Sequence, residues 1–349
     1  MNMNELHSSI NGIEKSFFKR NARRAVNMVA FAAIISMVLT YVFYIAVDLA
    51  SPFVRELIIN IVTKAGQNEF YATLFAEIFL YGEEYNWFIS VVSAVLCSFV
   101  PFVIISKHML LMDAADAAPL KGKILGSFPF VYCAALMAAN IVSAVADGIF
   151  SVVFPDAYKI AASEISEIYG NITSETSLIL AFLSMCIVAP FAEEFIYRGV
   201  IFGYVKKYGV YFAAFSSSLI FGLAHATVSQ IAYTFIFGFV LCMVTYKTGN
   251  LKTAILMHFI NNLVGYMQAY LLPYLGFEDA VTIFETLYSL IVGIFAVVGL
   301  ILYFKDNKYS ENKADNENNA PISCFFGIGT VLVIVFSIIN VVLGIFANG

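Results

Sequence analysis

Two adjacent carboxylates, an arginine, two histidines and an asparagine are the residues of this chain whose types and spacing could do chemistry. Glu193, Glu194 and Arg198 end a run that carries no charge from Leu178 to Ala192. An unpaired charge at the centre of a lipid bilayer costs about 2.5 to 3.5 kcal/mol on insertion scales. A charged cluster in such a run therefore needs a compensating role, and catalysis is a leading candidate.

The two carboxylates are expected to have different roles. On an α-helix, residues four apart share a face, whereas neighbours diverge by about 100°. Glu194 is therefore predicted to face Arg198 and to form an ion pair that holds the end of the helix. Glu193 then points elsewhere, and it is the candidate reactive carboxylate.

Two of the four histidines lie within or at the ends of apolar runs, and the other two lie in polar segments and are interpreted as surface residues. His225 follows Phe221 by four residues, and His258 shares a helical face with Asn262. A carboxylate and a neutral histidine can together deprotonate water. Histidine and asparagine donors can hold the negative charge that develops on an attacked carbonyl oxygen. These side chains are the parts needed to hydrolyse a carbonyl compound.

The order and spacing of these residues resemble the CAAX protease and bacteriocin-processing family of intramembrane endopeptidases, which includes type II CAAX prenyl endopeptidases and abortive-infection proteins. The resemblance covers roughly residues 178–270 and rests on three motifs: Glu193-Glu194-x-x-x-Arg198, Phe221-x-x-x-His225 and His258-x-x-x-Asn262. It implies that Glu193 and His225 activate water and that His258 and Asn262 form the oxyanion hole. It also implies that Glu194, Arg198 and Phe221 support them.

An older interpretation of such families makes them metalloproteases. In that case Glu193, His225 and His258 would bind zinc and leave an open position for water. The chain lacks the His-Glu-x-x-His motif of the common zinc proteases. We favour a mechanism without a cofactor, and zinc is the alternative.

Composition decides which elements must position these residues. The chain has 349 residues, of which 61% are hydrophobic and 12% are charged. Soluble domains are nearer half apolar and a quarter charged, so this chain is predicted to be a polytopic membrane protein. A net charge of -5 and the lack of a basic stripe argue against a nucleic-acid partner. The expected partners are the lipid bilayer and a membrane-anchored or hydrophobic peptide substrate.

Apolar runs long enough to cross a hydrocarbon core of about 30 Å predict an all-α bundle of about nine transmembrane helices. The runs are 26–50, 87–106, 124–146, 178–198, 209–226, 231–246, 253–273, 282–304 and 322–347. A cytoplasmic N-terminus would place every lysine and arginine on the inner side except Arg55, Lys64 and Lys159. The positive-inside rule favours this orientation. We therefore expect an integral, multi-pass protein of a bacterial cell membrane.

The runs and the motifs divide the chain into four regions. These are a cytoplasmic arm at 1–25, an N-terminal transmembrane region at 26–177 with two long outer segments, a catalytic helix core at 178–273, and C-terminal helices at 274–349 that include a polar inner linker at 305–321. In the first outer segment, Phe70 to Tyr81 could form an interfacial helix. Gly222, Gly238 and Gly265 are expected to allow close helix packing.

Straight helices would not bring the candidate residues together. Counted at 1.5 Å per residue, Glu193 and His225 would lie about 20 and 25 Å from the inner boundary, and His258 would lie about 9 Å from it. Either the fourth and fifth helices are tilted and broken, which Pro190 permits, or the predicted boundaries are misplaced.

Two other classes of function fit part of the sequence. A proton-coupled transporter would also bury carboxylates and histidines, but it is expected to contain inverted repeats, and the sequence has no such symmetry. A non-catalytic immunity or scaffold protein could use the same helices with dispensable site residues.

Overall fold

The chain is a bundle of helices. The structure, a computed structural model, describes residues 3–112, 114–160, 172–305 and 319–346. Of the described residues, 87% are helical and none lies in a β-strand. Within those ranges, six spans are long and apolar enough to cross a membrane: Gly12–Lys64, Glu83–His108, Phe128–Val153, Glu175–Tyr208, Val228–Thr248 and Asp279–Gly299. The predicted all-α, polytopic architecture is confirmed, and the protein is a multi-pass membrane protein.

The first helix is much longer than the predicted span of 26–50. Helix α1 runs from Met3 to Lys64, a length of 62 residues that continues through Pro52. At 1.5 Å per residue it is about 93 Å long, three times the thickness of a hydrocarbon core. Hydropathy does not predict the additional turns, because lysine, arginine and glutamate are good helix formers in polar segments. Most of the predicted 1–25 arm is therefore helical.

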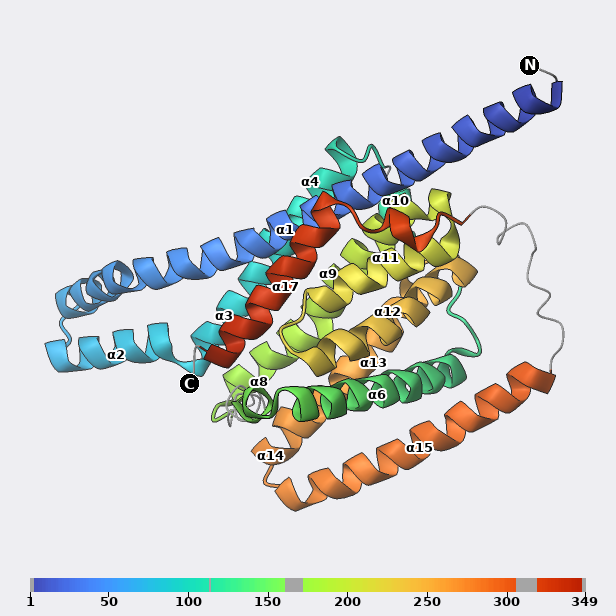
Figure 1. Ribbon diagram of the computed structural model, residues 1–349. Helices are drawn as coiled ribbons and strands as arrows, with labels where there is room; N and C mark the ends of the chain where they lie inside the picture. Colours follow the sequence, from blue (N-terminus) through green and yellow to red (C-terminus); the bar gives the residue numbers. More distant parts are fainter. Residues whose placement is uncertain (1–2, 113, 161–171, 306–318, 347–349) are drawn as a thin grey trace.

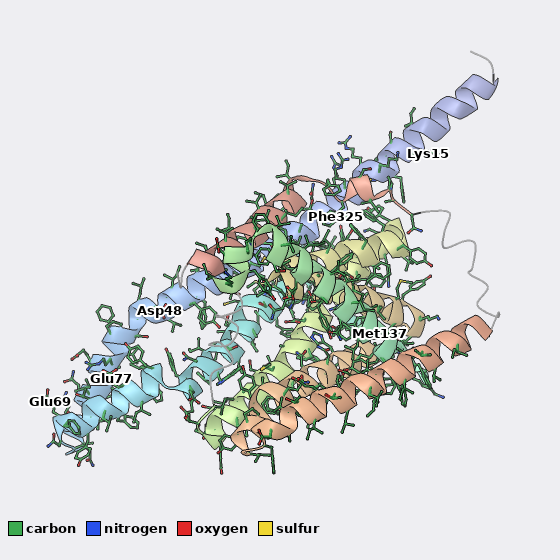
Figure 2. The ribbon with its side chains drawn as sticks, turned by 60° about the horizontal axis from the view of Figure 1, so that its bottom comes forward. Lys15, Asp48, Glu69, Glu77, Met137 and Phe325 are labelled. Carbon is green, nitrogen blue, oxygen red and sulfur yellow. The ribbon has the colours of Figure 1, made fainter. Side chains whose placement is uncertain are left out.

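The C-terminal end of α1 pairs with α2 (Glu69–Tyr81) to form a hairpin beside the bundle (Figures 1 and 2). Asn68 begins α2, since its side-chain oxygen accepts the Phe70 N–H at 2.8 Å. The helix predicted from Phe70 to Tyr81 is therefore confirmed. The opposite end of α1, which carries Lys15, projects from the bundle on the other side (Figure 2).

Helix α12 (Val228–Thr248) packs between two other helices. This helix contacts α11 (Val210–Leu223) on one side and α6 (Phe128–Val153) on the other, and α15 (Glu278–Lys305) covers α6 (Figure 1). The last helix, α17 (Ile328–Phe346), packs against α1. The smaller elements are α3 (Glu83–Ser93), η1 (Ala94–Phe99), α4 (Val100–His108), α5 (Ala114–Ala117), α13 (Lys252–Tyr266), η5 (Met267–Leu271), α14 (Leu272–Tyr274) and η6 (Ile322–Cys324).

The span that carries the two carboxylates is helical throughout but irregular. It consists of α8 (Glu175–Phe182), η2 (Leu183–Val188), α9 (Ala189–Glu193), η3 (Glu194–Phe202), α10 (Gly203–Val205) and η4 (Lys206–Tyr208). Segments η2 and η3 are π-helical, and π-helical turns are rare and frequent at functional sites. Glu193 is the last residue of α9 and Glu194 is the first of η3. A change in helical winding therefore falls between the two carboxylates.

Three π-helical segments each end two residues before a proline. In each case the residue before the proline donates its N–H five residues back: Val100 to Val95, Ala189 to Ser184, and Leu272 to Met267. Proline has no N–H, and its ring clashes with the carbonyl four residues earlier. The wider π turn accommodates both effects. Pro190 therefore changes the winding of its helix without ending it.

Two of the three predicted packing glycines lie at close contacts. A Cβ atom on Gly222 would lie 2.8 Å from the Ile231 carbonyl oxygen, and one on Gly238 would lie 2.8 Å from the Arg198 guanidinium. The prediction for Gly265 is wrong, because nothing lies within 4 Å of its Cβ position. Most of the predicted 305–321 linker and part of the second outer segment fall outside the described residues.

Candidate active site

The predicted ion pair is present and fully buried. Arg198 Nη1 donates to Glu194 Oε1 at 2.8 Å, and both side chains are 0% exposed. The guanidinium carbon of Arg198 lies 4.4 Å from the centre of the Phe221 ring on α11. A desolvated cation–π contact of this kind contributes about 2 kcal/mol. Gly238 on α12 leaves room for the guanidinium group.

His258, on α13, has a carboxylate near each of its ring nitrogens. Its Nδ1 lies 2.7 Å from Glu194 Oε1, and its Nε2 lies 3.6 Å from Glu193 Oε2. The contact between Glu194 and His258 was not predicted, because spacing along one helix cannot show what a second helix contributes. Glu194 is therefore shared between Arg198 and His258.

The two carboxylates differ in their access to the outside of the protein. The side chain of Glu193 is 32% exposed, whereas that of Glu194 is 0% exposed. The site thus has a closed side, formed by Glu194 and Arg198, and an open side at Glu193.

His225 lies just past the end of α11, in the short connection to α12, and not inside the predicted 209–226 helix. Its Nδ1 is 2.9 Å from the Phe221 carbonyl oxygen. Since a carbonyl oxygen only accepts hydrogen bonds, Nδ1 carries the proton and Nε2 of the neutral ring is free to accept one. His225 also interacts electrostatically with Glu193 and His258.

The Phe221 ring brings the two imidazoles together. Its centre lies 5.1 Å from that of His225 and 6.1 Å from that of His258, both in edge-to-face geometry. Residues that are far apart in the sequence thus meet around one aromatic side chain. The straight-helix depths did not predict this meeting, because the helix of Glu193 is irregular and α11 ends before His225.

Asn262 lies on α13, one turn beyond His258, and its Nδ2 donates to the Met185 carbonyl oxygen on η2 at 2.8 Å. Ala189, the residue after η2, bonds five residues back to Ser184. The next donor in that register would bond Met185, but the next residue is Pro190, which has no N–H. Asn262 therefore supplies the missing donor, and its Nδ2 keeps a second hydrogen.

Two polar residues beside the site were not among the predicted ones. Asn261 Nδ2 donates to Asn262 Oδ1 at 3.2 Å, and the Tyr233 hydroxyl donates to Asn261 Oδ1 at 2.6 Å. The position of Asn261 next to Asn262 was the sequence signal for the first contact. Tyr233 had no signal, because it lies on a different helix, α12.

The alternative zinc site was tested on the same side chains. Among the described residues, no three His, Cys, Asp or Glu side chains form a group that could hold a metal ion. Glu193, His225 and His258 are therefore not gathered as a metal-ligand group in the described structure, and Glu194 lies at Nδ1 of His258. No step below is assigned to a metal.

Comparison with known proteins identifies a family that resembles part of the chain. Residues 175–264 match the family model described as Type II CAAX prenyl endopeptidase Rce1-like. No curated protein and no solved structure matches the chain. The matched segment contains all three predicted motifs, and its family is one of membrane-embedded peptidases. The predicted resemblance is therefore confirmed: residues 175–264 are similar to the Rce1-like type II CAAX prenyl endopeptidases.

Proposed function

We propose that this protein is an intramembrane endopeptidase that hydrolyses a peptide bond in a membrane-anchored or hydrophobic peptide. The observation that carries the proposal is the position of His258, with Glu194 at one ring nitrogen, Glu193 near the other and Phe221 against its ring. Three motifs far apart in the sequence meet there, on the segment that matches the peptidase family.

Glu193 and His225 activate the water in this proposal. The partly exposed Glu193 carboxylate accepts a proton from water while Nε2 of His225 accepts a hydrogen bond from the same molecule. The water oxygen attacks the carbonyl carbon, and the carbonyl oxygen becomes an oxyanion. Glu193 then returns its proton to the leaving nitrogen as the C–N bond breaks. The products are a new carboxylic acid and a new amine, and the acid passes its remaining proton to the amine to give a carboxylate and an ammonium group.

His258 and Asn262 stabilise the oxyanion. Because Nδ1 of His258 bonds Glu194, its Nε2 can donate only when the ring carries both protons. In that form His258, together with Arg198, balances the charges of Glu193 and Glu194, which lowers the cost of burying the site. The second hydrogen of Asn262 Nδ2 is the other donor, and one such donor contributes roughly 10² to 10³ in kcat.

The description of the matched family suggests one substrate class, a peptide with a prenylated cysteine near its C-terminus. An unmodified hydrophobic or membrane-spanning peptide is the other member of the proposed class. Both would bring a peptide bond to a site that lies inside a helix bundle.

The test is a comparison of peptide termini in membranes from cells with the wild-type protein, Glu193→Ala or Glu175→Ala. Glu175 is an exposed glutamate in the first turn of the same span, so it is a matched control. We expect mass spectrometry to find termini that disappear only with Glu193→Ala. A synthetic peptide spanning that cleavage site then serves as the reporter peptide, with and without a prenyl group. Identical termini in all three membranes would contradict the proposal.

A further inference from the structure

A chain of hydrogen bonds links α12, α13 and η2 through one of the proposed oxyanion donors. The Tyr233 hydroxyl donates to Asn261 Oδ1 at 2.6 Å, and Asn261 Nδ2 donates to Asn262 Oδ1 at 3.2 Å. Asn262 Nδ2 completes the chain by donating to the Met185 carbonyl oxygen at 2.8 Å. All three side chains are half-buried.

The donors and acceptors of this series of hydrogen bonds can be arranged in only one direction. A carboxamide can turn over, and a tyrosine hydroxyl can either donate or accept, so these members alone would allow both directions. The Met185 carbonyl oxygen only accepts, and it needs a donor because Pro190 has none to offer. If Asn262 alone turned over, its oxygen would face the Met185 oxygen and its nitrogen would face the Asn261 nitrogen. Two bonds would become two repulsive contacts.

We propose that Tyr233 and Asn261 are positioning residues that hold the Asn262 carboxamide in its donating orientation. This inference rests on the proposed function, in which Asn262 donates to the oxyanion. With Asn261 bonded to Oδ1, the Asn262 nitrogen stays directed at the span that also carries Glu193. A turned carboxamide would present its oxygen instead and would repel an oxyanion. Neither Tyr233 nor Asn261 needs to touch the substrate.

The protein contains a second tyrosine that serves as a matched control for Tyr233. Tyr132 and Tyr233 both pack against the Phe237 ring, with ring centres 6.3 and 6.0 Å from it. The Tyr132 hydroxyl bonds the Tyr288 hydroxyl at 2.9 Å, and within the described part of the chain this pair makes no hydrogen bond to Asn262. Tyr132→Phe and Tyr233→Phe therefore each remove a hydroxyl group from the same aromatic cluster. Only Tyr233→Phe removes a donor from the series of hydrogen bonds that reaches Asn262.

The experiment measures kcat and KM on the reporter peptide for Tyr233→Phe, Tyr132→Phe, Asn261→Ala and Asn261→Asp. Asn261→Asp keeps the shape and an acceptor for Tyr233 but has no donor for Asn262, so it serves if Asn261→Ala fails to fold. We expect both Asn261 variants to lower kcat by roughly tenfold, and Tyr233→Phe by about threefold, with KM unchanged. Tyr132→Phe is expected to retain the wild-type kcat.

A double-mutant cycle with Asn262→Ala decides whether Asn261 acts through Asn262. If it does, adding Asn261→Ala to Asn262→Ala causes no further loss of kcat. Independent, multiplying losses, or wild-type kcat in the Asn261 variants, would overturn the positioning role and leave the proposed function intact. Failure of Glu193→Ala to stop cleavage would overturn the proposed function itself, and the positioning role with it.

Discussion

The centre of the bundle and the α1–α2 hairpin each contain an arginine–glutamate pair, and the two pairs have almost the same length. Arg198 and Glu194 are 2.8 Å apart with both side chains 0% exposed, whereas Arg55 and Glu77 are 2.7 Å apart with 29% and 44% exposure. Exposed pairs contribute about 0 to 1 kcal/mol. Removing one partner of a buried pair costs about 3 to 5 kcal/mol, because the other charge is left uncompensated. Environment, and not bond length, separates these two regions.

The central pair is also less completely satisfied than its length suggests. Glu194 Oε2 and Arg198 Nε and Nη2 are buried and have no hydrogen-bond partner within the described part of the chain. A pair selected for stability alone would not leave three such atoms, since each costs free energy. Local rules are violated most often at functional sites. The cost at the centre is therefore consistent with a role for Glu194 in holding His258.

The largest effect is expected from Glu193→Gln, on the open side of the centre. Removing the proposed general base should lower the cleavage of the reporter peptide by roughly 10² to 10⁴. The melting temperature in detergent should stay near that of the wild type, because Glu193 is partly exposed and is not part of the buried pair. Rate and melting temperature measured on one preparation check this. A parallel loss of both would make Glu193 structural and would remove the difference between the two carboxylates.

The next largest effect is expected from Arg198→Met, on the closed side. It leaves Glu194 charged and buried, so we expect a loss of about 3 to 5 kcal/mol in the free energy of unfolding. Arg55→Met, which breaks the exposed pair, should lose less than about 1 kcal/mol. Denaturant unfolding in mixed micelles measures both values. The double variant Arg198→Met with Glu194→Gln should be more stable than Arg198→Met alone, and an equal or lower stability would contradict the uncompensated-charge explanation.

The site residues at the centre of the bundle could be predicted because they lie in short sequence motifs. The spacing of Glu194 and Arg198 predicted their ion pair, and the order of the three motifs placed Phe221, His225 and His258 in one site. It could not predict that Glu194 also bonds His258, since that contact depends on how α13 packs against η3. Counting residues along straight helices separated Glu193 from His258, whereas the structure places Glu193 Oε2 3.6 Å from His258 Nε2.

The α1–α2 hairpin was predicted less completely than the site. Hydropathy detects a membrane-spanning run, but it does not detect a polar helix that continues beyond that run. Helix α1 therefore extends from Met3 to Lys64 where 26–50 was predicted. The π turns had a usable signal in Pro101, Pro190 and Pro273, but proline alone does not distinguish a kink, a π turn and a helix end.

A smaller effect is expected from Pro190→Ala, which gives back an N–H at the position where Asn262 now bonds Met185. The new donor would compete for the Met185 carbonyl oxygen and free Asn262 to move. We expect kcat on the reporter peptide to fall by roughly threefold to tenfold, with unchanged or higher stability. Pro273→Ala, after the π-helical segment η5, is the matched control and should leave kcat unchanged. Equal rates in wild type and Pro190→Ala would show that Asn262 needs no such anchor.

The smallest effect is expected from metal removal. This experiment tests whether protein side chains alone balance the charges of the two carboxylates at the centre of the bundle. In the proposed mechanism, His258 and Arg198 balance the charges of Glu193 and Glu194, and a zinc ion at Glu193, His225 and His258 would replace that balance with its own charge. Exhaustive chelation followed by metal analysis should leave kcat within about twofold of the untreated protein, because no proposed step uses a metal. Loss of activity that one equivalent of zinc restores would contradict this. It would also require Nε2 of His258 to bind the ion in place of the oxyanion, since Nδ1 already bonds Glu194.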